Sequence, residues 1–291
     1  MSNCQVYHQD CREGIKNLTD NSVDAVITDP PYELNLLGKS WDNTGIAYDV
    51  NLWREVHRVL KPGGHVLAFG ASRTYHHLAL ALEQAGFEIR DCIMWIYNTG
   101  MPHGKNLTGD FKGWSTGLKP AYEPIVVARK LMDTSVQVNM ENHHTGAFHI
   151  DACRVAGDKW PANVITDDGD TFRYFYCPKA SAKDRDEGLE DFPLKRTGSM
   201  SATVDASMLT GSGNVRKTVR RNIHPTVKPT ELMQFLCRLV SAKDGLILDP
   251  FAGSGSTGKA AKLEGLNFVG FELEEEYVKI ANARIAFIDR N

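Results

Sequence analysis

The sequence predicts an α/β protein built on a mostly parallel, doubly wound β-sheet with helices on both faces. Short β-branched apolar runs such as 23–27 alternate with segments of helical periodicity such as 52–60. A glycine-rich turn at 249–258 follows a strand pattern and precedes a helix pattern. With 291 residues, of which 42% are hydrophobic, the chain can bury a large core without disulfides or metal.

Composition excludes some classes of protein and leaves others open. The formal net charge of −3 says nothing about nucleic acid, because charges of opposite sign can occupy different faces. The six cysteines are scattered without C-x-x-C spacing, and the pairs His76-His77 and His143-His144 lack a third ligand, so we predict reduced thiols and no metal site. Residues 1–10 do not resemble a signal peptide, and no apolar run is long enough to span a membrane, which indicates a cytoplasmic protein.

The first half of the chain reads as alternating strands and helices. Proline ends the strand at 23–27, and Lys61-Pro62-Gly63-Gly64 stops the helix at 52–60. The expected elements that follow are a strand at 65–69, a helix at 75–85, a strand at 88–95, a loop over 98–117 and a strand at 123–130.

The region 132–222 is polar and irregular, and regularity returns at 224–229. Thr230 can cap a helix that runs to about Val240. A strand at 246–248, a helix that runs through Glu264, a strand at 268–271 and a helix at 275–287 complete the chain.

The glycine-rich turn predicts a nucleoside pocket. Its glycines let the backbone approach a ligand, and Glu272 stands at the end of the next strand, where an acidic side chain accepts hydrogen bonds from ribose hydroxyls. Tight packing without a ligand is the alternative. A dinucleotide would require a second mononucleotide half, yet fewer than 20 residues follow Glu272. Asp249 would repel a pyrophosphate but suits the cationic S-adenosylmethionine.

A second motif, Asp29-Pro30-Pro31-Tyr32, follows the first strand. Alone it could be a structural turn. The Asp29 carboxylate and the Pro30 carbonyl are both acceptors for the two donors of an exocyclic NH2 group, and Tyr32 offers a ring on which a nucleobase can stack.

The two motifs together resemble those of the β-class DNA amino-methyltransferases, the family that modifies adenine N6 or cytosine N4. In that family the catalytic motif precedes the cofactor motif, a circular permutation of the usual Rossmann-like methyltransferase order. The resemblance extends to Asp10-Cys11, to 59–64 and to 224–229, and omits only the middle region. It implies a catalytic half at 1–131, an inserted target-recognition region at 132–222 and a cofactor-binding half at 223–291.

The resemblance also implies a role for each motif residue. Asp29, Pro30, Pro31 and Tyr32 would hold the target base. Asp10 would contact the adenine of S-adenosylmethionine, Glu272 its ribose, and the loop 249–257 its methionine and sugar. The complete implied cofactor set is Asp10, Cys11, Asp29, His224, Thr226, Lys228, Asp249, Phe251, Gly253, Ser254, Gly255, Ser256, Thr257 and Glu272.

The implied reaction is a direct methyl transfer to a flipped adenine, with S-adenosyl-L-homocysteine as product. Acceptors at Asp29 and Pro30 would draw both N–H bonds out of the ring plane and localise the nitrogen lone pair. Asp in the first motif position favours adenine N6, whereas Ser there is usual for cytosine N4, which is the alternative. Cytosine C5 chemistry requires a Pro-Cys nucleophile, and Cys177-Pro178 has the reverse order, so we assign Cys177 a structural role. A non-catalytic DNA-binding regulator is a further alternative.

Two segments are candidates for contact with double-stranded DNA. The stretch 195–221 carries several cations against one acid, Asp205, although an ordinary solvated loop would look the same. Lys39 and Trp41 follow the catalytic motif, where Trp41 could wedge into the vacated base position or simply pack. The cations of the basic stretch are Lys195, Arg196, Arg216, Lys217, Arg220 and Arg221. By family analogy alone we expect a homodimer, with a restriction endonuclease as a possible companion.

Overall fold

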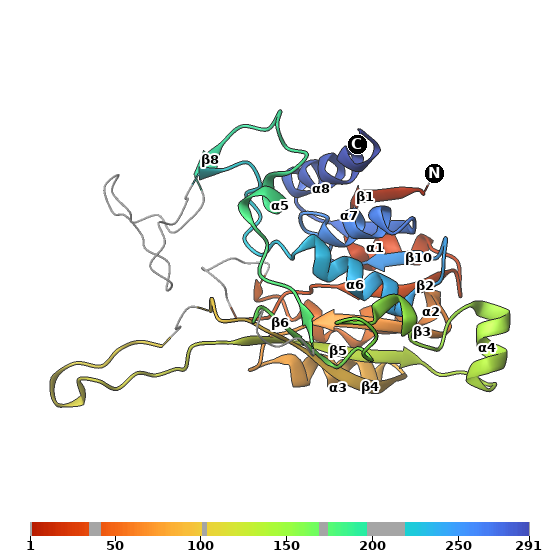
Figure 1. Ribbon diagram of the computed structural model, residues 1–291, viewed down its shortest axis with the longest axis horizontal. Helices are drawn as coiled ribbons and strands as arrows, with labels where there is room; N and C mark the ends of the chain where they lie inside the picture. Colours follow the sequence, from red (N-terminus) through yellow and green to blue (C-terminus); the bar gives the residue numbers. More distant parts are fainter. Residues whose placement is uncertain (1, 35–41, 101–103, 169–173, 197–218, 291) are drawn as a thin grey trace.

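One β-sheet organises the chain in the computed structural model, which describes residues 2–34, 42–100, 104–168, 174–196 and 219–290 (Figure 1). Nine strands within these ranges pair in the order β1-β11-β10-β2-β3-β5-β4-β6-β7. Their bounds are β1 Cys4–His8, β2 Val23–Thr28, β3 Leu60–Phe69, β4 Phe87–Ile96, β5 Tyr122–Lys130, β6 Val164–Thr166, β7 Phe175–Tyr176, β10 Leu246–Asp249 and β11 Asn267–Glu272. None of the described helices is both long and apolar enough to cross a membrane.

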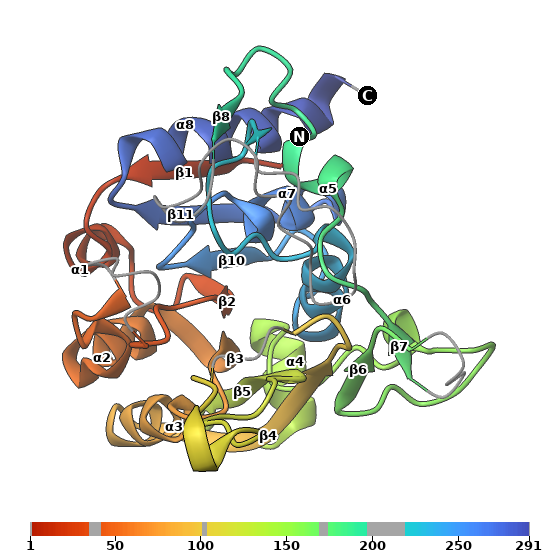
Figure 2. The same cartoon turned by 90° about the vertical axis from the view of Figure 1, so that its left-hand side faces the viewer.

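Helices cover both faces of the sheet, as the alternating burial of its strands requires. Along β2, Ala25 and Ile27 join one hydrophobic cluster with α6, α7 and α8, whereas Val26 joins a second cluster with α1, α2 and α3. Figure 2 shows α1, α2 and α3 on one side of the sheet and α6 and α7 on the other. The main helices are α1 Cys11–Gly14, α2 Val50–Val59, α3 Tyr75–Gln84, α4 Val136–His143, α5 Ala182–Asp186, α6 Thr230–Val240, α7 Ser256–Leu263 and α8 Glu275–Phe287.

The predicted fold is confirmed as a mostly parallel sheet, with one reversal. β5 runs antiparallel to both of its neighbours, β3 and β4, while the other neighbouring pairs of the main sheet are parallel. A pattern of apolar residues fixes that a segment is a strand but not its direction. The reversal places the amino end of β5 at the edge where β2 and β10 end.

Two local expectations were wrong in detail. Lys61-Pro62-Gly63-Gly64 does end the helix, but it lies within β3 rather than before it, and the pairing of β3 with β2 shifts register there. Thr230 is the first residue of α6 rather than its cap, which is Pro229. The carboxylate of Asp184 accepts the Thr230 N–H at 2.9 Å, so a side chain distant in sequence caps this helix.

The middle region contributes to the main sheet, which the sequence did not predict. β6 pairs with β4 and β7 pairs with β6, so residues of 132–222 extend the sheet at its far edge. A second, two-stranded sheet joins β8 Lys195–Arg196 to β9 Val219–Arg220. The segment expected as a loop after Tyr97 projects from the body as a long narrow arm (Figure 1).

Candidate active site

The site lies where the strand order reverses. From β10 the chain continues to β11 on one side, and from β2 it continues to β3 on the other, so β2 and β10 flank a topological switch point. Ligands of open α/β sheets bind at such a point, beyond the carboxyl ends of the strands. A cavity of about 680 Å³ opens there, and both predicted motifs line it. The hydroxyl of Thr28 donates to the Asp249 carboxylate at 2.6 Å and ties the two strand ends together.

The glycine-rich turn owes its path to two glycines with positive φ. Gly253 has φ 50°, its N–H donates to Glu272 Oε2 at 3.0 Å, and a Cβ there would lie 2.8 Å from Nε2 of His224. Gly255 has φ 74°, and a Cβ there would lie 2.8 Å from Cβ of Ala281 in α8. The first glycine therefore shapes the cavity wall, and the second lets α7 pack closely on α8.

Two acidic residues of the cofactor half have partners that fix their orientation. Asp249 accepts the hydroxyl of Thr257 at 2.7 Å and the N–H of Phe251 at 3.0 Å in addition to Thr28. Burial raises the pKa of Asp249 to about 6, against these donated hydrogen bonds, which favour the carboxylate. Burial also raises the pKa of Glu272, whose two oxygens accept the N–H groups of Gly253 and Glu274.

At the catalytic motif, Lys228 joins two carboxylates. Its ammonium lies 2.5 Å from Oδ2 of Asp29 and 3.3 Å from Oε2 of Glu123. The Tyr32 hydroxyl donates to the same Glu123 oxygen at 3.0 Å. Asp29 Oδ1, by contrast, is buried and has no hydrogen-bond partner among the residues that the structure describes. One carboxylate oxygen is thus held by a cation, while the other is a buried acceptor with unused hydrogen-bonding capacity in a residue that lines the cavity.

Burial and charge act in opposite directions on this cluster. Burial raises the pKa of Asp29, and the Lys228 ammonium opposes the rise. Burial would lower the pKa of Lys228, but Asp29 and Glu123 together raise it, so the lysine is charged. Burial likewise tends to raise the pKa of Glu123, but Lys228 and Lys179 outweigh it and hold this pKa below its usual range. The Lys228 ammonium therefore lies between two carboxyl groups, of which Glu123 is ionised and Asp29 is held between burial and the neighbouring cation.

The backbone of the catalytic motif is held from the α2–α3 side. The Tyr32 carbonyl accepts the Thr74 hydroxyl at 3.0 Å, and the carboxylate of Asp42 accepts the Glu33 N–H at 2.9 Å. Glu33 adopts a left-handed conformation with φ 56°. These bonds fix the turn that presents Asp29 and Tyr32 to the cavity.

Most residues implied for the cofactor meet at this cavity. Asp10 and Gly255 are absent from its lining. Asp10 instead caps α1 and pairs with Arg12 at 2.6 Å, while its neighbours Gln9 and Cys11 reach the cavity. The implied residues that do line it are Cys11, Asp29, His224, Thr226, Lys228, Asp249, Phe251, Gly253, Ser254, Ser256, Thr257 and Glu272, together with Pro30, Pro31 and Tyr32.

His224 is neutral in this wall. Burial, with the nearby cations Arg185 and Lys228, lowers the pKa of His224 to about 3. Its ring meets the Tyr277 ring edge-on, with 4.7 Å between centroids. Tyr277, in the first turn of α8, also lines the cavity, and no sequence motif pointed to it.

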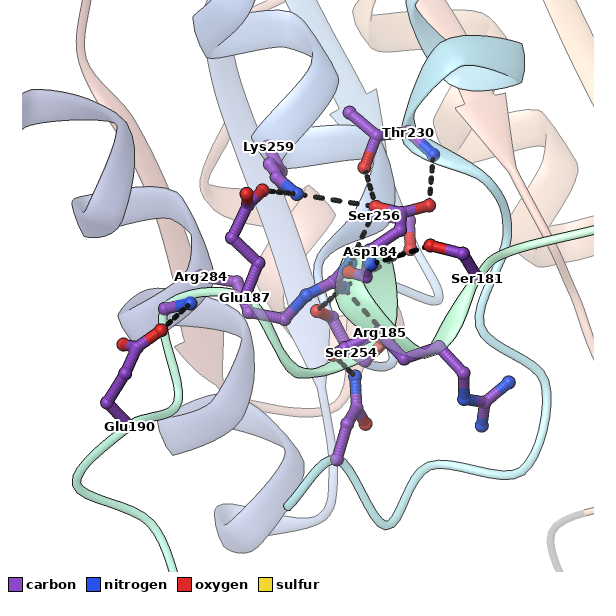
Figure 3. A network of polar contacts seen from close by, with 12 residues as sticks. Ser181, Asp184, Arg185, Glu187, Glu190, Thr230, Ser254, Ser256, Lys259 and Arg284 are labelled. Atoms are coloured by element: carbon purple, nitrogen blue, oxygen red, sulfur yellow. Dashed lines mark hydrogen bonds and ion pairs between the residues drawn. The ribbon is translucent and has the colours of Figure 1, made fainter. Parts of the chain in front are cut away.

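A polar network from the middle region supports the glycine-rich turn from behind (Figure 3). Asp184 in α5 lies 3.3 Å from Lys259 Nζ and 3.9 Å from the Arg284 guanidinium. Arg284, which is fully buried, donates to the Ser254 carbonyl at 2.6 Å. The cofactor turn thus depends on α5, and no local sequence signal pointed to this contact.

The predicted DNA-contact residues are placed only in part. Lys39, Trp41, Arg216 and Lys217 lie outside the described residues. Lys195 pairs with Glu276 of α8, and Arg221 donates to the Phe192 carbonyl at 2.7 Å. Lys195, Arg196 and Arg220 lie together in the β8–β9 pair. Cys177 is buried and its carbonyl accepts the indole N–H of Trp95 at 2.8 Å.

Comparison with known proteins identifies the class. A family model described as DNA methylase, of the N6/N4 methyltransferase type, matches residues 23–283. Type II methyltransferase M.HindIII of Haemophilus influenzae is 24% identical over 342 residues, covering 98% of this chain and 96% of that protein. PvuII DNA methyltransferase, which is cytosine-N4-specific, shares the fold with a TM-score of 0.61 at 17% identity, covering 98% of this chain and 86% of that one. The M1.HpyAVI–SAM complex matches with a TM-score of 0.53 at 23% identity, covering 97% and 98%.

The chain belongs to the N6/N4 DNA methylase family, since the family model covers most of its length. It is an S-adenosylmethionine-dependent DNA amino-methyltransferase, as its two motifs predicted. The acceptor Glu123 was missed at the sequence level. Glu123 lies near the amino end of β5, whose reversed direction brings it to the site, and the direction of a strand has no local sequence signature.

Proposed function

We propose that the protein methylates N6 of an adenine that is flipped out of double-stranded DNA. The observation that carries the proposal is the position of Asp29. Asp29 lines the same cavity as the glycine-rich turn, and its buried Oδ1 has no hydrogen-bond partner among the described residues. An acceptor at this point matches an exocyclic N–H donor, and Tyr32 supplies an aromatic surface for the base.

The cavity also suits the methyl donor. Asp249 and Glu272 give its cofactor half acidic character, and the neutral His224 adds no opposing charge. An acidic pocket attracts a sulfonium and repels a pyrophosphate. Bound S-adenosylmethionine supplies an electrophilic methyl group. We propose that Asp10, although its carboxylate is paired with Arg12, and Gly255 act through the loops they shape.

The chain's own residues then explain how an unreactive amine is made nucleophilic. Asp29 accepts one N–H of the target amine and, with the Pro30 carbonyl, draws the hydrogens out of the ring plane. Lys228 opposes the rise in the Asp29 pKa that burial causes, and so favours the ionised form that accepts hydrogen bonds. The amine nitrogen gains positive charge as the methyl is transferred and becomes neutral again when one of its N–H protons leaves. The second carboxylate, Glu123, offsets the nearby Lys228 ammonium during this step.

The choice of adenine rests on the aspartate at the first motif position. Cytosine N4 is the second candidate, because an N4-specific enzyme shares this fold. Complete digestion of methylated plasmid DNA to nucleosides, followed by mass spectrometry, separates the two. We expect N6-methyldeoxyadenosine, and N4-methyldeoxycytidine alone would overturn the base assignment while leaving the enzyme class intact.

The role of Asp29 is tested with Asp29→Ala and Asp29→Asn, both assayed for transfer of tritiated methyl groups to DNA. We expect loss of transfer by at least about a thousandfold in Asp29→Ala, while cofactor affinity stays within a few-fold of wild type. Asp20→Asn is the matched control, because Asp20 is an exposed partner of Arg58 away from the cavity. Full activity of Asp29→Ala would refute the assignment.

We further propose, from the family pattern alone, that the protein forms a homodimer and that 132–222 recognises the target sequence. A restriction endonuclease companion would place it in a restriction-modification pair. Sedimentation velocity measures the first of these properties. Sequencing that maps modified bases in DNA from expressing cells reports the recognition site.

A further inference from the structure

The arm formed by residues 104–119 has no role in the site described so far. It is a two-stranded ribbon, bridged between Asn106 and Ser115, in which the Leu107 N–H donates to the Trp114 carbonyl at 2.9 Å. The two strands lie close at the base, where a Cβ on Gly104 would be 2.5 Å from the backbone nitrogen of Gly117. Residues 105–119 are exposed throughout.

The side chains of the arm combine cations with large apolar groups. Lys105, Lys112 and Lys119 stand against one acid, Asp110. Trp114 is 69% exposed and Phe111 is 61% exposed, although both are residues that proteins usually bury. Exposed aromatic side chains among lysines are suited to binding a nucleic acid, because phosphates can contact the cations while bases or sugars contact the rings.

The position of the arm favours DNA over other partners. The arm follows β4, which is parallel to β6 and points the same way as β2, so it leaves the sheet at the edge that carries the active site. In Figure 1 it extends beyond the end of β3, and Figure 2 looks onto that edge with the arm in front. A target base can reach Asp29 only if the duplex lies against this edge.

The base of the arm is fixed, so its direction is set by the fold. The Asn98 N–H donates to the Asp167 carboxylate at 3.0 Å, Lys119 donates to the Asn98 carbonyl, and the Tyr97 N–H donates to the Ala121 carbonyl at 2.8 Å. These bonds lie next to Tyr97, beside the Glu123 end of β5. A rigid root with an exposed tip is the arrangement expected of an element that engages a partner beside the active site.

We propose that the arm inserts into a groove of the DNA beside the flipped base, with Lys105 and Lys112 on phosphates and Trp114 against the bases or sugars. The major groove of B-DNA admits a two-stranded ribbon of this kind. This inference deepens the proposed function and rests on it in one respect, namely that the substrate is duplex DNA. A second copy of the chain is the other conceivable occupant, and the experiment includes it.

The lysines are tested in the double variant Lys105→Gln/Lys112→Gln. We measure DNA affinity against salt with a duplex that wild type methylates. Loss of two phosphate contacts should reduce the slope of log K against log salt by about 1.8. The matched control is Lys279→Gln, because Lys279 is an exposed lysine on α8 that pairs with Glu275 of its own helix and is not part of the arm. Equal slopes for the double variant and wild type would overturn the proposal.

The aromatic contact is tested with Trp114→Ala, which should weaken duplex binding by roughly tenfold. Trp160→Ala is the control, because Trp160 is 67% exposed but precedes β6 and so lies toward the opposite edge of the sheet. Sedimentation velocity on the same variants distinguishes the other occupant. A change from dimer to monomer with unaltered DNA affinity would show that the arm binds a second copy and would overturn the DNA assignment.

The design separates failure of this inference from failure of the proposed function. If wild type transfers no methyl group to any DNA, the proposed function fails. If wild type methylates duplex DNA and the arm variants match it in affinity, salt slope and KM for DNA, only the arm inference fails. Cofactor affinity should stay at the wild-type value in all arm variants, since none of these residues lines the cavity.

Discussion

Replacement of Asp184 by alanine should destabilise the protein and loosen its cofactor turn. The carboxylate accepts the Thr230 N–H at 2.9 Å as a cap of α6, and it lies 3.3 Å from the ammonium of Lys259, which is only 2% exposed. Loss of a helix cap costs about 1 kcal/mol. Removal of one partner of a buried ion costs up to about 3–5 kcal/mol. In the variant, Lys259 would still pair with Glu187 at 2.7 Å, so we expect the lost Asp184–Lys259 ion pair to cost about 2 kcal/mol. Together with the lost cap, the expected total is about 3 kcal/mol.

The assay is urea-induced unfolding of wild type and Asp184→Ala at pH 7, with a titration of cofactor alongside. The variant should lose about 3 kcal/mol of unfolding free energy without a change in m. Its cofactor affinity should fall, because Asp184 helps to hold Arg284, which in turn holds the Ser254 carbonyl. Glu190→Ala is the control, since Glu190 is exposed and accepts the Gly188 N–H at 3.2 Å, away from Asp184 and Thr230 (Figure 3).

The pH dependence provides an independent check. Burial raises the pKa of Asp184, but the hydrogen bonds from Thr230 and the charge of Lys259 outweigh it and lower this pKa below its ordinary value of 3.8. A carboxyl with a depressed folded-state pKa stabilises the protein above its unfolded pKa, and this stabilisation is lost as pH falls through the folded value. The difference between wild type and Asp184→Ala should therefore shrink in acid. A difference below about 1 kcal/mol at pH 7 with equal m would refute the reasoning.

Three further predictions concern the site, the core and the basic segment. Glu123→Gln should lower kcat by about ten- to a hundredfold with little change in KM for DNA, because Lys228 loses a carboxylate beside the reacting amine. Steady-state kinetics measure both constants, and a change in KM alone would contradict the prediction. Burial lowers the pKa of His65 from 6.5 to about 3, so the unfolding free energy should fall by up to about 1.4 kcal/mol per pH unit as pH drops from 6.5 toward 3. His65→Gln should remove this slope from unfolding free energies measured in urea. Identical pH profiles for wild type and variant would argue against a neutral buried histidine. Charge reversal at Arg220 and Arg221 should weaken DNA binding and reduce its salt dependence in a filter-binding titration, whereas unchanged binding at every salt concentration would favour a solvated loop.

The sequence determined the individual strands, helices and turns, because each depends mainly on residues that are neighbours in the chain. The β-branched run at 23–27, the turn at 249–258 and the periodic segment at 275–287 fix a strand, a ligand loop and a helix locally, and each was found within a residue or two. The sequence also predicted that Asp29 and the glycine-rich turn lie at the same site, because parallel strands of one sheet end at one edge.

Tertiary structure alone decided contacts between segments far apart in the chain. The reversal of β5 brings Glu123 to Lys228, and the packing of α5 brings Asp184 to Thr230. Neither contact has a local sequence signature, because the direction of a strand and the packing position of a helix depend on which arrangement is most favourable for the whole fold. For the same reason Asp10, placed at the cofactor by its motif, turns to Arg12, and an arm that looked like an ordinary loop stands beside the active-site edge.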